Sequence, residues 1–207
     1  HSIFVSKYDA ALAENYQLLS VHDKRSVIYP GLSLNNLPHV FPHAPLHIGF
    51  IGRLEYQKDP LLFVEMMAFL PGYSATIVGD GALAPMVKQE IIKRGLSGRV
   101  HMAGELVHGE ALKILAKLSV VVLTSRWEGL PVLVLESMGM GVPVVSMNVS
   151  GLEEIIHNEV NGMLVEKRRG EDLAEKVKIL TNNEDLKVSL IKKAQETIQE
   201  KFSMENM

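Results

Sequence analysis

The feature that most constrains the fold of this chain is a regular alternation of short Val- and Ile-rich runs with longer segments of helical period. This alternation is typical of a parallel sheet whose strands are joined by crossover helices. The expected strands are 46–51, 75–78, 99–102, 120–123, 143–147 and 162–165. Helices are expected to begin at Pro60, Ala82, Gly109, Pro131, Leu152 and Glu171. The predicted fold class is α/β, a Rossmann-like doubly wound parallel sheet.

The two ends of the chain depart from this pattern. Residues 3–5, followed by a helical stretch at 9–19, resemble one more strand–helix unit, and the prolines within 32–45 indicate a linker. After Asn183 an amphipathic helix is expected to run to about Phe202. We therefore expect four parts, namely a remnant of another domain at 1–25, a linker at 26–45, the main domain at 46–182 and a C-terminal helix at 183–207.

Composition excludes several classes of function. The formal net charge of −3 over 207 residues gives no reason to expect a nucleic-acid partner. The absence of cysteine excludes disulfides and cysteine-ligated zinc, and no apolar run reaches the roughly 18 residues that a membrane span requires. We expect a protein of the cytoplasm, or of the inner face of a membrane. Because the chain begins at His1 rather than at a methionine, we also expect it to be a fragment.

Two cations lie at the first strand-to-helix corner of the expected main domain. Gly52 and Arg53 end the strand, and Lys58 precedes Asp59, which is placed to cap a helix that has Pro60 at its first position. A lysine beside a helix N-terminus opposes the helix dipole, and an anion such as a diphosphate in the gap would offset this. The alternative is a solvated lysine and an arginine in a surface salt bridge. These residues alone leave both interpretations open.

A glycine-rich segment follows the next expected strand. Residues 79–84 read Gly-Asp-Gly-Ala-Leu-Ala and fit the G-x-G-x-x-G/A fingerprint of a dinucleotide site. Glu105 lies past the following strand, near where such a site keeps its ribose-binding acid. The fingerprint belongs on the first unit of its fold, however, and here a unit containing Arg53 and Lys58 precedes it. The alternative is that Gly79 and Gly81 make a tight turn.

A pair of acids flanks the start of another expected helix. Pro131 suits the first helical position, which leaves Glu128 and Gly129 in the preceding loop and Glu136 in the helix body. The rise from Pro131 to Glu136 is about 7.5 Å, comparable to a pyrophosphate between a ribose and a sugar. The two carboxylates can therefore address the two ends of a nucleotide-sugar, with free helix N–H groups at its phosphates. The alternative is that both are exposed acids. This is less consistent with Glu136, because it follows the apolar Val and Leu residues at 132–135.

In this order the motifs resemble those of the large group 1 family of retaining glycosyltransferases, which includes sucrose synthases, bacterial glycogen synthases, and bacterial mannosyl and lipopolysaccharide-core transferases. The most specific element is 128–136, which is similar to the family's Glu-x7-Glu motif. Other similar segments are 27–31, 52–54 with Lys58, 78–81 and 141–145, while Asp59 stands where glycine is common. The resemblance implies a GT-B fold, of which this chain is the C-terminal, donor-binding half.

The resemblance also implies a role for each motif. As catalytic residues, Arg53 and Lys58 would hold the diphosphate, and Glu128 would bind hydroxyls of the donor sugar. The implied donor-binding residues are Gly52, Gly79, Asp80, Gly81, Glu105, Leu106, Ser125, Gly129, Leu130, Pro131 and Glu136. Among them, Glu136 would bind the ribose hydroxyls. The implied donor is a UDP-sugar, with a GDP-sugar as second choice, and no metal site is expected.

The implied activity is transfer of a hexose, with retention at the anomeric carbon, to a glycan or lipid-linked acceptor in cell-surface polysaccharide or glycoconjugate synthesis. The acceptor, and any peripheral membrane contact, would belong to a domain outside this chain, so the chain alone is expected to bind donor without turnover. Three alternatives stay open at this point. They are a sugar-nucleotide epimerase of GT-B type, a nicotinamide-binding oxidoreductase that uses 79–84 and Glu105, and a non-catalytic nucleotide-sugar sensor.

Overall fold

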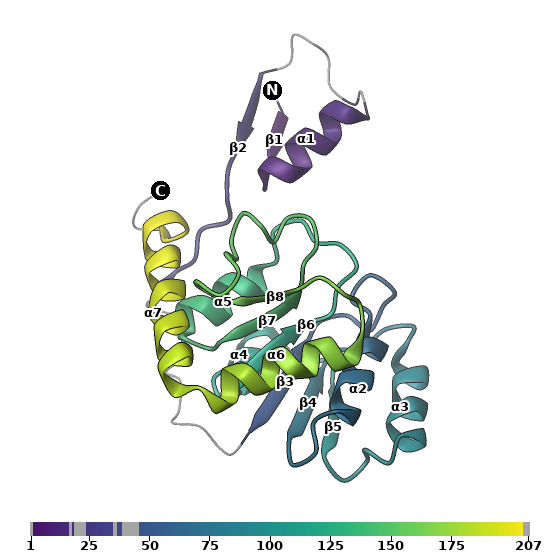
Figure 1. Cartoon of the computed structure of the whole chain (residues 1–207). Helices are drawn as coiled ribbons and strands as arrows, with labels where there is room; N and C mark the ends of the chain where they lie inside the picture. Colours follow the sequence, from purple (N-terminus) through teal and green to yellow (C-terminus); the bar gives the residue numbers. More distant parts are fainter. Residues whose placement is uncertain (1, 17, 19–23, 35–36, 39–45, 205–207) are drawn as a thin grey trace.

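The computed structural model describes residues 2–16, 18, 24–34, 37–38 and 46–204, and its main body is a six-stranded parallel sheet (Figure 1). The strands are β3 (His47–Ile51), β4 (Ser74–Val78), β5 (Val100–Gly104), β6 (Val120–Leu123), β7 (Val144–Met147) and β8 (Met163–Val165). Their order in the sheet is β5-β4-β3-β6-β7-β8. The predicted α/β class is confirmed, and the bounds of each strand lie within two residues of those expected.

Helices cover both faces of this sheet (Figure 1). One face packs against α2 (Pro60–Ala68), α3 (Ala84–Lys93) and α6 (Gly170–Asn182), and the other against α4 (His108–Leu115), α5 (Val132–Met140) and α7 (Glu184–Lys201). Every residue of β6 and of β7 is buried. Strands that are covered on both faces can be apolar on both, which is why they appear in the sequence as Val-rich runs, with Ser146 the one polar residue of β6 and β7.

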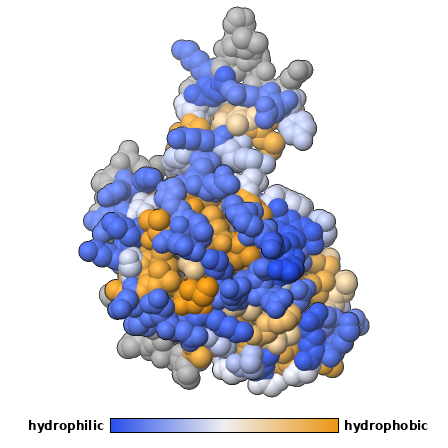
Figure 2. Space-filling model, in the orientation of Figure 1, coloured by the Kyte–Doolittle hydropathy of each residue, from blue (hydrophilic) through white to orange (hydrophobic). Residues whose placement is uncertain are grey.

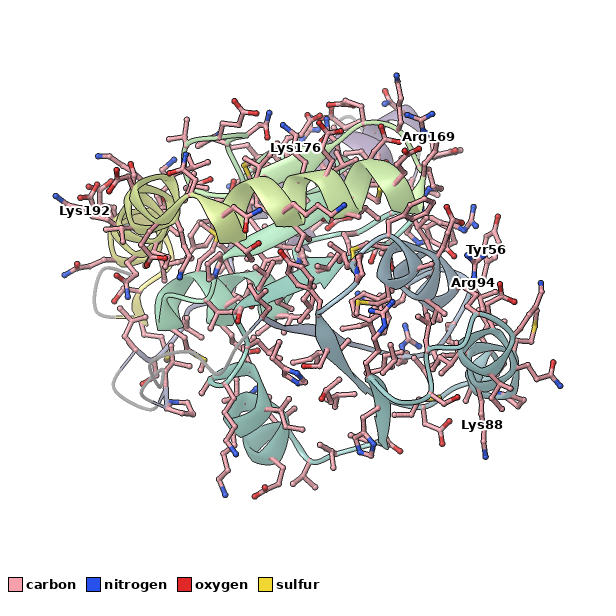
Figure 3. The ribbon with its side chains drawn as sticks, turned by 60° about the horizontal axis from the view of Figure 1, so that its bottom comes forward. Tyr56, Lys88, Arg94, Arg169, Lys176 and Lys192 are labelled. Carbon is pink, nitrogen blue, oxygen red and sulfur yellow. The ribbon has the colours of Figure 1, made fainter. Side chains whose placement is uncertain are left out.

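The outer surfaces of the helices are polar. Arg169, Lys176 and Lys192 point outward from the region of α6 and α7 (Figure 3). In the space-filling view, apolar residues gather near the centre of one face, framed by the polar surfaces of these two helices (Figure 2). Within the described ranges, no helix combines the length and the apolar character that crossing a membrane would demand.

A small N-terminal unit stands beside the main body and contains β1 (Ser2–Phe4), α1 (Lys7–Asn15) and β2 (Arg25–Val27). Its two strands pair in parallel, so this unit continues through Val27, just past the expected boundary at residue 25. The carboxylate of Glu154, in the main body, accepts hydrogen bonds from the backbone N–H groups of Lys7 and Tyr8 at 3.1 and 2.9 Å. Glu154 therefore binds the N-terminus of α1, where a negative charge is favourable.

Tyr29 reinforces this junction between the two parts. Its hydroxyl donates to Glu154 at 2.8 Å, and its ring makes an edge-to-face contact with Phe202, 5.4 Å between centroids. Burial, together with the hydrogen bond and the charge of Glu154, raises the pKa of Tyr29 to about 12. The hydroxyl therefore stays protonated and able to donate at any physiological pH.

Two expectations about helices need correction. The helix expected at 9–19 forms with shifted bounds, from Lys7 to Asn15, and Ser6 caps its start by accepting from the backbone N–H of Asp9. The helix expected from Leu152 does not form, and 150–155 are a series of turns. Gly151, which precedes the expected start, has φ of 86°, whereas the residue before a helix typically has extended backbone. The apolar pattern there reflects burial of the turn residues Leu152 and Ile155.

Candidate functional site

The topology of the sheet defines where a ligand is expected to bind. From β3 the chain builds β4 and β5 toward one edge, and α4 then returns it to β6 on the other side of β3. Doubly wound sheets bind ligands in the crevice outside the carboxyl ends of the two strands at which this reversal occurs. The loops at 52–59 and 124–131 leave from the carboxyl ends of β3 and β6. The candidate site therefore lies between these two loops.

Lys58 and Glu128 meet in this crevice. The Lys58 Nζ lies 2.6 Å from the Glu128 Oε1, and the Ser125 hydroxyl donates to the same oxygen at 2.5 Å. The Glu128 side chain is only 5% exposed, whereas that of Lys58 is 22% exposed. A nearly buried carboxylate thus holds a partly exposed ammonium group, which has two further N–H groups beyond the one directed at Glu128. This arrangement brings three predicted site residues together.

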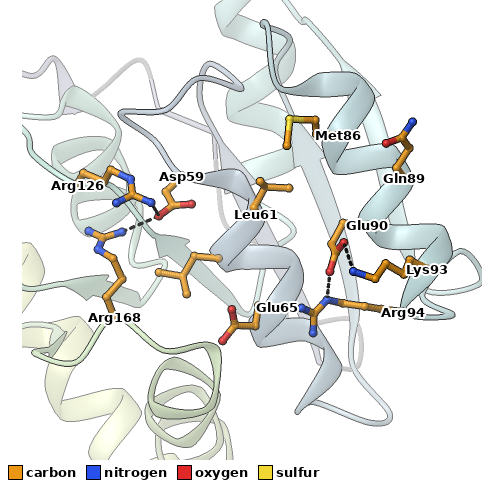
Figure 4. Close-up of a pocket in the computed structure, with 11 residues that line it drawn as sticks. Asp59, Leu61, Glu65, Met86, Gln89, Glu90, Lys93, Arg94, Arg126 and Arg168 are labelled. Atoms are coloured by element: carbon orange, nitrogen blue, oxygen red, sulfur yellow. Dashed lines mark hydrogen bonds and ion pairs between the residues drawn. The ribbon is translucent and has the colours of Figure 1, made fainter.

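Asp59 does not cap α2, and that expectation was wrong. Its backbone is left-handed, with φ of 47° and ψ of 58°, and its side chain makes no capping bond. Its Oδ2 instead accepts a hydrogen bond from Arg168 at 3.0 Å and forms an ion pair with Arg126 at 2.8 Å (Figure 4). Arg168 also donates to the carbonyl of Thr124, at the end of β6, at 2.8 Å. The Thr124 hydroxyl bonds the carbonyls of Lys58 and Asp59 at 2.8 and 2.9 Å, so this network fixes the backbone beside Lys58.

Arg126 and Arg168 were not predicted from the sequence. Arg168 is 109 residues away from Asp59 along the chain, so no local pattern connects them. The one available signal was that Asp59 stands where glycine is common. A left-handed residue there explains the preference for glycine, and aspartate is among the few side chains that tolerate this conformation.

Two substitutions of Asp59 distinguish the contribution of its ion pairs to stability from that of its left-handed backbone. We expect Asp59→Ala to lower the free energy of unfolding by about 2 kcal/mol, since two partly buried arginines lose their shared carboxylate. Asp59→Gly should recover about 1 kcal/mol of this loss, because glycine adopts the left-handed conformation without strain. Urea unfolding measures both effects, with Asp172→Ala as control, because this change removes the carboxylate that pairs with the exposed side chain of Arg169. Equal effects of Asp59→Ala and Asp172→Ala would contradict the structural role of Asp59.

Glu136 lies in the body of α5, as expected, but this helix begins one residue later than predicted. Pro131 is the N-cap rather than the first helical residue, with extended backbone at ψ of 115°, and Val132 begins the helix. The Glu136 side chain is 8% exposed, and its Oε1 lies 2.6 Å from the Nε2 of His108, at the start of α4. The two acids of the motif therefore have different partners, Lys58 for Glu128 and His108 for Glu136.

The loop at 79–81 packs against the loop that follows β3. A Cβ atom at Gly79, where φ is 131°, would lie 2.0 Å from the carbonyl oxygen of Gly52. Glycine is therefore required by this close approach. The Asp80 carboxylate is exposed and accepts from the N–H of Gly81 at 2.7 Å. Because this loop follows β4 rather than the central strand β3, it does not occupy the position of a dinucleotide fingerprint.

The other predicted residues lie around the same edge of the sheet. Arg53 is exposed just past β3, Glu105 is exposed and Leu106 half-buried just past β5, and Leu130 is buried. Across the described residues, no hydrogen bond or ion pair joins Arg53 or Glu105 to Lys58 or Glu128. The structure thus brings together Lys58, Ser125 and Glu128, and leaves Arg53 and Glu105 at the rim.

Comparison with known proteins identifies the family. Residues 38–197 match the family described as Glycosyl transferases group 1. The chain belongs to this glycosyltransferase family. An uncharacterised glycosyltransferase of Methanocaldococcus jannaschii is 30% identical over 204 residues, which covers 98% of this chain and 55% of that protein. The chain thus spans about half the length of this relative.

Solved glycosyltransferase structures agree with the fold. A mutant of S. aureus TarM, crystallised with UDP, α-GlcNAc-glycerol and fondaparinux, is 26% identical and superposes with a TM-score of 0.85 over 98% of this chain and 41% of its own. The C-terminal domain of a group 1 glycosyltransferase from Francisella tularensis is 22% identical, with a TM-score of 0.70, over 82% of this chain and 90% of its own. The main body therefore has the fold of the C-terminal, donor-binding half of a GT-B glycosyltransferase.

Proposed function

We propose that this chain binds the nucleotide-sugar donor of a retaining glycosyltransferase, with the donor in the crevice between β3 and β6. The observation that carries the proposal is the contact of Lys58 with the nearly buried Glu128 at this crevice. It places a cation and a hydroxyl-binding carboxylate side by side, as the junction between a diphosphate and a sugar requires. The adjoining N-terminus of α5 supplies free backbone N–H groups for the phosphates.

In this proposal each predicted residue has one task. Lys58 and Arg53 bind the diphosphate and stabilise the negative charge that develops on the departing nucleotide, so that no metal is required. Glu128 binds hydroxyls of the sugar, since its position in a loop and its bonds to Lys58 and Ser125 suit recognition better than nucleophilic attack. Glu136 binds the ribose. The backbone of 129–131 contacts sugar and phosphate, and the loops at 79–81 and 104–106 face the base.

We propose a UDP-sugar as donor and a GDP-sugar as second choice. The similarity to TarM, which was crystallised with UDP, supports the first. Calorimetric titration with UDP, GDP, ADP and NADH tests the proposal, and UDP is expected to bind most tightly, with or without EDTA. Glu136→Gln should weaken UDP binding by about 10-fold, the effect of losing a charge-assisted hydrogen bond, while Glu175→Gln, at an exposed position on α6, should change it less than about 2-fold. Tight NADH binding that depends on Glu105 would instead indicate an oxidoreductase domain.

The proposed whole enzyme transfers a hexose to a glycan or lipid-linked acceptor, in polysaccharide or glycoconjugate synthesis on the cytoplasmic side of a membrane. We assign 46–182 to the donor domain, α7 (Glu184–Lys201) to a C-terminal helix, 28–45 to a linker and 1–27 to the acceptor domain, because β2 extends the N-terminal unit past the expected boundary at residue 25. Exposed apolar side chains in the N-terminal unit support the last assignment, among them Ile3, Val5 and Tyr16. We infer that this chain alone binds donor without turnover, which a transfer assay on the isolated chain would test.

A further inference from the structure

The carboxylate of Glu136 is in an unusual environment for a charged group. Glu136 lies on α5 between Leu135 and Ser137, both buried, and its own side chain is 8% exposed. Buried carboxylates require hydrogen-bond donors, because water no longer solvates them. A ligand that binds this carboxylate therefore meets a group whose orientation is already set by its protein partner.

His108 is that partner. It is the first residue of α4, its side chain is 72% exposed, and its Nε2 lies 2.6 Å from the Oε1 of Glu136. The contact joins the helix that follows β5 to the helix that follows β6, on the same face of the sheet. A carboxylate on α5 is thereby held by a side chain at the start of the helix that follows the loop 104–106, which is proposed to face the base.

The hydrogen bond leaves room for a ligand. An ionised carboxylate has about four acceptor positions, and one donor from His108 occupies one of them. The two adjacent hydroxyls of a ribose can donate to the positions that remain. The bond to Oε1 fixes the plane of the carboxylate, which is what simultaneous acceptance from two hydroxyls requires.

We propose that His108 is a positioning residue that orients the Glu136 carboxylate for the ribose, and that it thereby sets the preference for ribose over 2′-deoxyribose. The inference rests on the proposed role of Glu136 in binding the ribose. An exposed histidine would ordinarily be expected to contribute little, because a hydrogen bond between two exposed side chains is weak. Here only one partner is exposed, and the other has little access to water that could replace the imidazole.

The test compares the affinities for UDP and 2′-deoxy-UDP, measured by calorimetry on the whole chain. The wild type is expected to prefer UDP by about 30-fold, within the range for hydrogen bonds to a charged group. His108→Ala should reduce this preference below about 5-fold while changing the affinity for 2′-deoxy-UDP by less than about 2-fold. His108→Gln, which retains an N–H donor, should restore most of the preference. Lys113→Ala, on the exposed part of the same helix, should have no effect.

Each outcome distinguishes the inference from the function on which it rests. An unchanged preference in His108→Ala would overturn the positioning role. An equal loss of affinity for both nucleotides would also overturn it, because that result indicates a structural role alone. Glu136→Gln serves as the reference. If Glu136→Gln keeps the wild-type preference, the proposed binding of ribose by Glu136 is wrong, whatever His108 does.

Discussion

Replacing Lys58 with methionine is expected to lower the affinity for UDP by between about 10- and 100-fold. A charge-assisted hydrogen bond contributes about 1.5 to 3 kcal/mol, and 1.4 kcal/mol corresponds to a factor of ten in affinity. The Lys58 ammonium lies at the crevice between β3 and β6 and is held by Glu128, so it is positioned for the phosphates before the ligand arrives. Calorimetric titration with UDP measures the loss, and Lys176→Met, which removes a lysine from an ion pair on α6, is the matched control.

The lysine also has a structural partner, and its substitution must be separated from damage to the fold. Lys58→Met leaves the nearly buried Glu128 carboxylate without its cation, which is destabilising in itself. The double variant Lys58→Met with Glu128→Gln removes both charges, and we expect it to regain stability in urea without regaining affinity for UDP. If the double variant bound UDP as tightly as the wild type, Lys58 would have no direct part in phosphate binding.

The sheet was predictable because its signals are local. Strands such as β6 and β7 are buried on both faces and therefore appear in the sequence as short runs rich in Val, interrupted in β7 only by Ser146. Pro60 marks the first residue of α2, where its missing N–H has no intrahelical partner to lose. The pairing of Glu128 with Lys58 was not predicted. It arises because β3 and β6 are neighbours in the sheet, so the loops that leave their carboxyl ends lie side by side.

The errors arose where distant loops meet. Asp59 before Pro60 has the local pattern of a helix cap, but two arginines from other loops bind its carboxylate and the backbone turns left-handed. His108 showed no signal, because its partner Glu136 lies on a different crossover helix. These contacts depend on the order of strands in the sheet. That order is set by long-range packing and is not written in any short segment.

The backbone contact beneath Glu128 yields the prediction with the largest expected effect on stability. Gly151 has φ of 86°, and a Cβ atom there would lie 1.9 Å from the carbonyl oxygen of Gly129 and 2.6 Å from that of Glu128. Both obstacles are backbone atoms, which cannot rotate away as a side chain would. We expect Gly151→Ala to lower the free energy of unfolding by about 3 kcal/mol or more, the sum of a left-handed alanine and an overpacked contact.

Substitutions at two other glycines separate the cost of a left-handed alanine from the cost of the overpacked contact. Gly95 has φ of 67°, and no atom lies within 4 Å of the place a Cβ would take, so Gly95→Ala should show the conformational term alone, about 1 kcal/mol. Gly98 has equally open surroundings and no left-handed backbone, so Gly98→Ala should be neutral or slightly stabilising. Urea unfolding ranks the three. Because the displaced carbonyls belong to the loop that carries Glu128, Gly151→Ala should also weaken the binding of UDP-sugar. If Gly151→Ala lowered the free energy of unfolding no more than Gly95→Ala does, the loop would move aside without cost and the contact would not be a constraint.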